Sequence, residues 1–235
     1  MLPWAFSRSR GAGLPTHHLP GGDGIMTLSL DLHLPMWHVT AAGGAQFSAD
    51  RSYRYRLQRR WDGGPSLMII ELRPSEANEH RDDAASRRAA AFARGFGYGA
   101  FTSVCLYAAV AVGEAHLVTS TSDSVGPDND WWIEQAAYCH DVIVFAWGGE
   151  AAVARANAVA SRVWQICQET SAAVAVVGWS PEGQPCGLPD RHRSGLACSD
   201  TVLVLSTVTA HAHTDFGDVD PRWSALLADT HHLVA

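Results

Sequence analysis

The chain has 235 residues, of which 47% are hydrophobic and 17% are charged, and its formal net charge is -7. These values predict a soluble globular protein and exclude an intrinsically disordered one. No apolar run is long enough to span a bilayer, so we expect no membrane partner. The negative charge argues against a nucleic-acid-binding surface that covers the whole molecule.

Cysteine and histidine spacings give no sign of a metal site. The 5 cysteines show no close pairing of the zinc-binding kind, and no two of the 12 histidines form a His-Glu-x-x-His motif. We therefore expect neither a metal nor a cofactor. The odd cysteine count and the lack of a signal-peptide pattern favour a cytoplasmic location. Nothing in the sequence predicts the oligomeric state.

The chain divides into two segments by composition. Residues 1–50 are rich in Gly, Pro, Ser and His and show little hydrophobic periodicity. We expect a flexible segment here, or a mis-annotated leader if Met26 or Met36 is the true start. Residues 51–235 are expected to form a single α/β domain.

The first predicted strand is rich in arginine and alternates in character. Strand periodicity places Tyr53, Tyr55 and Leu57 on one face and the residues between them, including Arg54 and Arg56, on the other. All 17 basic residues of the chain are arginines, as a GC-rich genome also produces. This strand therefore has two interpretations, a solvated edge strand and a phosphate-binding surface interleaved with aromatic rings.

Later elements alternate between strand and helix. The apolar segment Ser-Leu-Met-Ile-Ile-Glu-Leu follows an Asp-Gly-Gly turn and is expected to pair with the first strand as a hairpin. Helices are then expected from Asp82 or Asp83 to about Arg94, from Asp128 or Asp130 to Cys139, at 150–169 and after Asp220, with strands at 100–110, 141–147, 172–179 and 201–208. The alternation predicts an α/β fold, a three-layer α/β/α sandwich with a mostly parallel central sheet.

In an open parallel sheet, ligands bind beyond the carboxyl ends of the strands. The loops at those ends contain Arg73 and Ser75, then Tyr107, then Trp147 and Gly148. We therefore predict a ligand site at this edge of the sheet, with these residues as its ligand-binding candidates. Arg54 and Arg56 on the arginine-rich strand are candidate phosphate-binding residues.

The adjacent aspartates Asp82 and Asp83 have two interpretations. One aspartate can cap the following helix while the other complements its dipole. Alternatively, one carboxylate stays free at the sheet edge and orients a water molecule or a ligand hydroxyl. The residues alone favour the structural interpretation, and they leave the catalytic one open.

Seven short motifs, and the order in which they occur, are similar to those of one known family. The motifs are YRYRLQRRW, LRPSEA, RDDAASRR, GYGAFTSVCLYA, VGPDND, AWGG and GQPCGLP. In this order they resemble a bacterial domain family of unknown function, number 1643. The resemblance makes residues 51–190 a family-like core and residues 191–235 a C-terminal extension.

The organisation of that family also looks like the uracil-DNA glycosylase fold. This likeness implies attack of a carboxylate-oriented water on an N-glycosidic carbon, with the base leaving as a stabilised anion. Asp82 or Asp83 would orient the water, Arg73 and Ser75 would contact the ligand, and Trp147 would stack against it.

The sequence departs from the family pattern at several loop positions. Arg73 stands where the family has Asn, Cys105-Leu106-Tyr107 replaces Asn-Leu-Phe, and Gly187-Leu188-Pro189 replaces His-Pro-Leu. Losing the amides and the histidine suggests an altered substrate or a lost activity. Arg73 adds a positive charge, which suits an anionic ligand or an ion pair with a neighbouring carboxylate.

The leading functional hypothesis is a glycosylase-like hydrolase that acts on a nucleobase, a nucleoside or a nucleic acid. One alternative is a non-catalytic member that uses Arg73 and the arginine-rich strand to hold an anionic ligand or a nucleic acid. Another is a tailoring enzyme in a small-molecule pathway. The partner is thus expected to be a small molecule or a nucleic acid.

Overall fold

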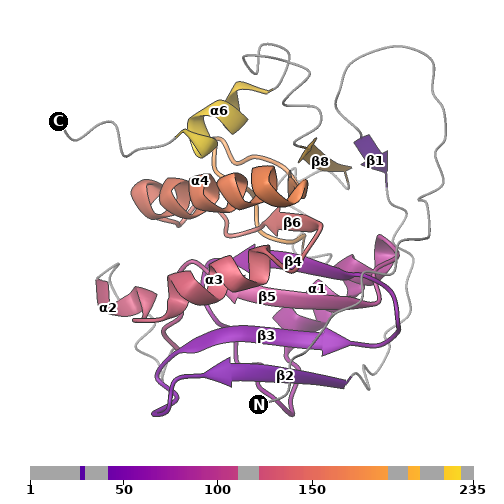
Figure 1. Cartoon of the computed structure of the whole chain (residues 1–235), viewed down its shortest axis with the longest axis vertical. Helices are drawn as coiled ribbons and strands as arrows, with labels where there is room; N and C mark the ends of the chain where they lie inside the picture. Colours follow the sequence, from indigo (N-terminus) through magenta and orange to yellow (C-terminus); the bar gives the residue numbers. More distant parts are fainter. Residues whose placement is uncertain (1–26, 30–41, 111–121, 190–200, 207–219, 229–235) are drawn as a thin grey trace.

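One mixed sheet of eight strands forms the centre of the protein. The computed structural model describes residues 27–29, 42–110, 122–189, 201–206 and 220–228. The strand order across the sheet is β1-β8-β7-β6-β4-β5-β3-β2 (Figure 1). The strands are β1 (Thr27–Ser29), β2 (Ala42–Phe47), β3 (Arg54–Arg60), β4 (Ser66–Glu71), β5 (Ala100–Cys105), β6 (Val142–Phe145), β7 (Ala173–Val176) and β8 (Thr201–Ser206).

The strand directions differ from the prediction. Strands β5, β4, β6 and β7 run parallel through three pairings at the middle of the sheet. The other four pairings among the described strands, β1–β8, β7–β8, β3–β5 and β2–β3, are antiparallel. The prediction of an α/β/α sandwich with a mostly parallel sheet is therefore wrong, because the strands on both sides of the centre reverse their direction.

Helices cover both faces of this sheet. The described helices are α1 (Ala84–Gly95), α2 (Ser122–Val125), α3 (Asn129–Ala137), α4 (Val153–Thr170) and α6 (Pro221–Leu227). α1 packs on one face, and α3, α4 and α6 contribute to the core on the other face, which is the nearer one in Figure 1. The structure confirms four helices that were expected from the sequence, namely α1, α3, α4 and α6.

Strand β4 is central because it is apolar on both sides. Leu67 and Ile69 pack in the core beneath α1, whereas Met68 and Ile70 pack in the core beneath α3 and α4. All four side chains are at most 2% exposed. Burying each such side chain contributes about 1.5–3 kcal/mol, so these residues fix β4 in the middle of the sheet. The loop that follows Glu71 is thereby anchored at its start.

The expected hairpin between β3 and β4 does not form, because β5 lies between them. The Asp-Gly-Gly turn packs instead against Gly99, just before β5. The backbone amides of Trp61 and Asp62 donate to the carbonyl of Gly99 at 2.9 and 3.1 Å. A Cβ atom on Gly99 would lie 2.6 Å from the amide nitrogen of Gly64, so only glycine permits this approach.

Two strands within residues 1–50 were not predicted. β1 pairs with β8 at one edge of the sheet, and β2 pairs with β3 at the other. The strand β2 has the sequence Ala-Gly-Gly-Ala-Gln-Phe, which lacks both alternation and β-branched residues. The expected flexibility of residues 1–26 and 30–41 lies outside the described residues.

A β-bulge in β3 changes which side chains share a face. In the pairing with β2, Gln46 is opposite Arg56 and Phe47 is opposite Arg54, so Tyr55 is the extra residue. Arg54 therefore lies on the same side as Leu57, beneath α1. Tyr55 lies on the opposite side, where its ring stacks on Trp132 of α3 with 6.3 Å between centroids. The alternation predicted for this strand is therefore wrong beyond the bulge.

A buried histidine joins the amino ends of the central strands to α3. His140 is 9% exposed, and its Nδ1 lies 2.6 Å from the carbonyl oxygen of Ala136. Since a carbonyl only accepts, Nδ1 carries the proton and Nε2 accepts from the hydroxyls of Ser66 and Thr102. Burial lowers the pKa of His140 below its ordinary value.

The lowered pKa of His140 predicts a loss of stability in mild acid. The unfolded chain binds a proton near pH 6.5, about the ordinary histidine pKa, while the folded state resists it. The free energy of unfolding should thus fall as the pH drops from about 7 through the folded-state pKa. Urea unfolding across this range should show a shallower fall for His140→Gln. Parallel pH profiles for the two proteins would contradict this account.

Candidate functional site

The carboxyl ends of β4 and β5 stay side by side beyond the strands themselves. The amide of Leu106 donates to the carbonyl of Glu71 at 2.9 Å, and the amide of Tyr107 donates to the carbonyl of Leu72 at 3.1 Å. These bonds bring Arg73 next to Tyr107, with the guanidinium carbon 5.6 Å from the ring centroid. The geometry is that of a cation–π contact.

Arg54 fixes the loop that follows β4. Its Nη1 donates to the carbonyl of Ala77 at 2.6 Å and to the carbonyl of Ser75 at 3.0 Å. The backbone amide of Arg54 also donates to the carbonyl of Ala108, the residue after Tyr107. Arg54 thus ties the loop of β4 to the segment after β5, and it is only 2% exposed.

Arg59 holds the far end of the same loop. Its Nε donates to Oδ1 of Asp82 at 2.8 Å, and its Nη2 donates to the carbonyl of Asn78 at 2.5 Å. A Cβ atom on Gly43 of β2 would lie 2.7 Å from Cδ of Arg59. The glycine therefore leaves room for the arginine side chain to cross the sheet edge toward the loop.

Asp83 is the N-cap of α1. Its Oδ1 accepts from the amide of Ser86 at 2.8 Å, and the Ser86 hydroxyl accepts from the amide of Asp83, which completes a capping box. Its Oδ2 accepts from the amide of Ala77 at 3.1 Å. Burial acts to raise the pKa of Asp83, but hydrogen bonds from Ser86, Ser75 and Ala77 outweigh it and hold the pKa below its ordinary value.

Asp82 is bound to other side chains as well. Oδ1 of Asp82 accepts from Nε of Arg59 and from the hydroxyl of Ser86 at 3.2 Å. The catalytic role of the two aspartates stays a prediction. The hydrogen bonds around them agree with the structural interpretation, since both oxygens of Asp83 and one oxygen of Asp82 are engaged.

Glu71 is a site residue that the sequence reasoning missed. It ends β4, and its Oε2 accepts from the hydroxyl of Ser103 on β5 at 2.6 Å. Burial raises the pKa of Glu71, although Ser103 and the charges of Arg54 and Arg88 oppose the rise. The available signal was a carboxylate at the end of an otherwise apolar strand in the middle of the sheet.

Several polar atoms at this edge are buried and have no hydrogen-bond partner among the described residues. They are Nη2 of Arg54, Nε of Arg73 and the hydroxyl oxygen of Tyr107. Buried donors nearly always have partners in native proteins, and leaving one unpaired costs about 1–3 kcal/mol. Two of the three are guanidinium nitrogens, which prefer an anionic acceptor.

Trp147 and Gly148 follow β6 and take part in packing. Trp147 is 2% exposed and its ring lies 4.9 Å from that of Phe145. Its Nε1 donates to the side chain of Gln184 at 3.1 Å. Gly148 has a φ of 78°, which a residue with a side chain rarely adopts, and its amide donates to the carbonyl of Pro185. The proposed stacking role of Trp147 stays a prediction, although its ring is enclosed in the core.

The arginines of β3 do not form a continuous exposed row. Arg54 and Arg59 are 2% and 4% exposed, and both bind the loop after β4. Arg56 is half-buried and lies 5.3 Å above the ring of Trp132. A surface that follows a phosphate backbone needs exposed cations, so this arrangement does not favour the nucleic-acid interpretation.

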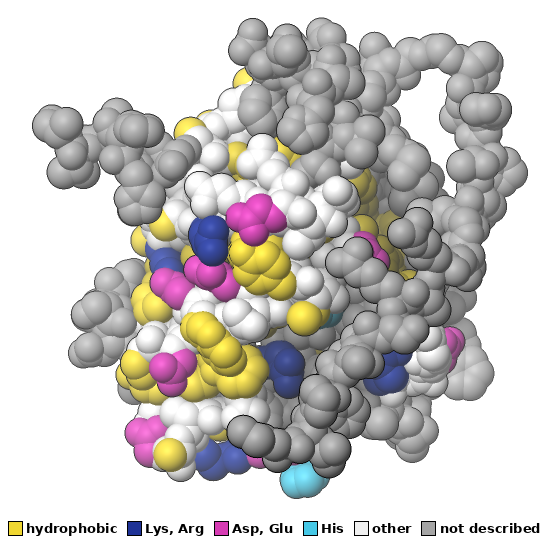
Figure 2. Space-filling model, in the orientation of Figure 1, with side chains coloured by type: hydrophobic (Ala, Val, Ile, Leu, Met, Phe, Trp, Pro, Cys, Tyr) yellow, Lys and Arg dark blue, Asp and Glu magenta, His cyan; other side chains and the backbone are white. Residues whose placement is uncertain are grey.

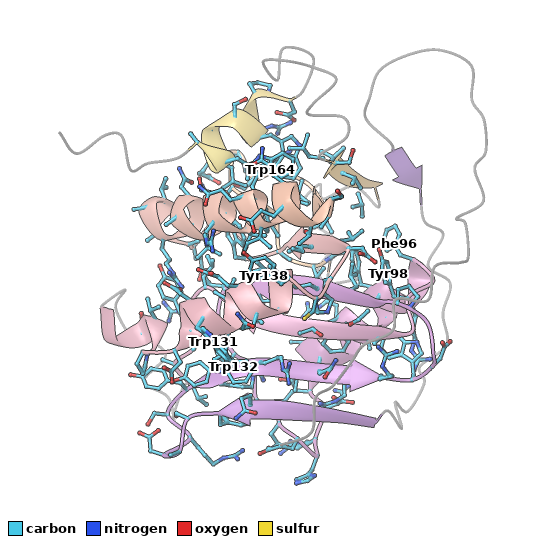
Figure 3. The ribbon with its side chains drawn as sticks, in the orientation of Figure 1. Phe96, Tyr98, Trp131, Trp132, Tyr138 and Trp164 are labelled. Carbon is cyan, nitrogen blue, oxygen red and sulfur yellow. The ribbon has the colours of Figure 1, made fainter. Side chains whose placement is uncertain are left out.

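The exposed aromatic residues near β3 belong to α3. Trp131 is 56% exposed and lies beside Trp132, close to β3, while Tyr138 at the other end of α3 is 42% exposed (Figure 3). Figure 2 shows apolar side chains on this face next to both acidic and basic ones. Glu134 lies between them in sequence and forms an ion pair with Arg162. This mixture of charges gives the face no cationic character.

Comparison with known protein families identifies the core of the chain. The family described as "Protein of unknown function (DUF1643)" matches residues 54–186, more than half of the 235 residues. The chain belongs to this family. No curated protein and no solved structure matches the chain. The resemblance drawn from the ordered motifs is thereby confirmed at the level of the family.

The DUF1643 match begins at Arg54 and ends at Cys186, so it contains β3 and the central strands of the sheet. β1, β2, β8 and α6 lie outside it. Three of the four antiparallel pairings involve these outer strands. The sheet of the DUF1643 region is thus mainly parallel, and the outer strands make the whole sheet mixed.

Two of the departures that the resemblance implies have visible structural consequences. Arg73, where the resemblance implies asparagine, has a partly unpaired guanidinium against Tyr107. Cys105, where the resemblance also implies asparagine, is fully buried, and burial raises the pKa of its thiol to about 12. A thiol that keeps its proton is a poor nucleophile, so Cys105 is not a candidate for covalent chemistry.

No group of three or more His, Cys, Asp or Glu side chains in the described part of the chain is arranged to hold a metal ion. No helix among the same residues combines the length and the apolar character that a membrane crossing requires.

The cap at Asp83 predicts a measurable loss of stability. Replacing Asp83 with Ala removes the acceptor for the amides of Ser86 and Ala77, which should lower the free energy of unfolding by about 1–2 kcal/mol. Glu76→Ala, in an exposed part of the same loop, should change it by less than about 0.5 kcal/mol. Urea unfolding measures both. Equal stability of Asp83→Ala and wild type would contradict the capping role of this carboxylate.

Proposed function

We propose that this DUF1643 member binds an anionic small molecule of the nucleotide class at the carboxyl ends of β4 and β5. The observation that carries the proposal is that buried Arg54 and half-buried Arg73 each have one buried guanidinium nitrogen without an acceptor among the described residues. Guanidinium groups bind phosphate and carboxylate oxygens through charge-assisted hydrogen bonds.

The surroundings of the two arginines support a specific site rather than a general attraction for anions. Arg54 is held by the carbonyls of Ser75 and Ala77, so its position is fixed before a ligand arrives. Arg73 lies against the ring of Tyr107, whose hydroxyl is also buried and unpaired within the described chain. Pre-positioned donors lose little entropy on binding, which strengthens the interaction.

Nucleotides are the first class to test because the sequence analysis expects a likeness to proteins that act on nucleobases. The family match itself does not extend to that likeness. In the hydrolytic form of this proposal, Asp82 or Asp83 orients a water molecule toward an N-glycosidic carbon. The hydrogen bonds that engage both aspartates weigh against that form. The binding proposal does not depend on it.

A thermal-shift comparison of uridine 5′-monophosphate with uridine tests the proposal, since the two compounds differ only by the phosphate. At about 100 times its dissociation constant, a ligand stabilises the folded protein by about 2.7 kcal/mol. We expect the monophosphate to raise the melting temperature and uridine not to. Arg73→Gln should abolish the shift, whereas Arg87→Gln, which removes an exposed arginine of α1, should retain it.

Three results would count against the proposal. Equal shifts with uridine and its monophosphate would remove the role of the anion. Equal melting-temperature shifts of Arg73→Gln and Arg87→Gln with the monophosphate would show that the ligand does not bind at this site. A shift with sulfate but not with the monophosphate would keep the anion site and exclude the nucleotide class. Chromatography of the incubated monophosphate detects any released uracil, and its absence would exclude the hydrolytic form for this substrate.

A further inference from the structure

Glu71 lies at the sheet edge that also holds Arg54 and Arg73, and the charge of Arg54 acts on its carboxyl group. The polar side chains of this edge are called the polar cluster. Glu71 is the last residue of β4, two positions after Ile69, so strand alternation places it on the face that α1 covers. Ser103 on the neighbouring strand donates its hydroxyl to Oε2 of Glu71 at 2.6 Å. On the other side of β4, β6 ends in Phe145, which is apolar.

Charged groups on two further elements, β3 and α1, act on Glu71. Arg54 on β3 and Arg88 on α1 favour its ionised form, and Asp83 at the start of α1 disfavours it. Asp83 itself is held as a carboxylate by the hydrogen bonds of the helix cap. The cluster therefore contains two carboxyl groups with opposite tendencies, one fixed as an anion and one that burial drives toward the neutral acid.

We propose that Glu71 is the proton-carrying, specificity-determining residue of the anion site, and that it takes up a proton from solvent when an anion binds beside Arg54 and Arg73. This inference rests on the proposed anion-binding function. An ionised Glu71 would repel a bound anion across a poorly solvated space. The neutral acid removes the repulsion, and its O–H becomes a further hydrogen-bond donor.

The other titratable groups of the cluster are less suited to this role. Asp83 cannot take up a proton without losing the cap of α1. Cys105 on β5 already keeps its proton, because burial raises its pKa to about 12. Glu71 remains as the group of this cluster whose charge can change while the hydrogen bonds of the loop stay in place. The site is thus expected to bind anions more tightly as the pH falls.

Sulfate is the probe that tests this inference, because its charge is constant from about pH 5 to pH 8. Its affinity for the wild-type protein, measured at constant ionic strength, should fall by up to about tenfold for each pH unit above the pKa of Glu71 in the free protein. Glu71→Gln imitates the neutral acid and should bind sulfate with little pH dependence. Glu76→Gln, which removes an exposed carboxylate from the same loop, should keep the wild-type profile.

A second measurement makes the test independent of how well Glu71→Gln folds. Calorimetry of sulfate binding in two buffers of different ionisation enthalpy counts the protons taken up, with His80→Gln used to exclude the exposed histidine of the loop. We expect uptake of up to about one proton per sulfate. Sulfate binding without proton uptake and without pH dependence would overturn the role of Glu71. Failure of sulfate to bind at any pH, to the wild-type protein or to Glu71→Gln, would overturn the anion site itself.

Discussion

Two buried arginines on β3 fix the loop on which the candidate site depends. Arg54 and Arg59 donate to four carbonyls of this loop and to the carboxylate of Asp82. Removing two guanidinium groups from water is costly, and hydrogen bonds to the loop offset that cost. The dependence is mutual, because the loop carbonyls at Ser75, Ala77 and Asn78 would otherwise need other donors. The loop and the sheet edge therefore stabilise each other.

This constraint positions the polar cluster. With the loop fixed, Asp83 caps α1, Arg73 lies on Tyr107, and Glu71 is covered beside Ser103. The DUF1643 match begins at Arg54, so the arginine and the loop that it binds both belong to the family region. The arginines of β3 thus act mainly from inside the protein, and the anionic ligand that we propose would meet only the donors that the loop leaves unused.

The sequence predicts the positions of strands and helices that have a clear apolar pattern or a capping residue. It does not predict which strands pair or in which direction they run. The apolar strand β4 and the helix α1 follow from local composition and capping residues. The reversed direction of the outer strands does not, because periodicity carries no information on which strands pair. The bulge at Tyr55 is also not predicted from the sequence. The extra residue interrupts the alternation of side chains between the two faces of the strand, and Arg54 therefore lies on the face beneath α1. The sequence places a candidate site at the carboxyl ends of the central strands, and that site stays a prediction. Glu71 was missed as a candidate because it looks like an ordinary strand end.

Amide hydrogen exchange in Arg54→Met tests the central role of the arginines most directly. Methionine keeps most of the buried stem and removes the donors to Ser75 and Ala77. The account predicts much faster exchange at the amides of Ala77 and Ser86, which are bonded to Asp83, with β6 and β7 losing only the protection that the overall change in stability requires. Unchanged exchange in the loop, or an equal loss of protection throughout the sheet, would contradict it.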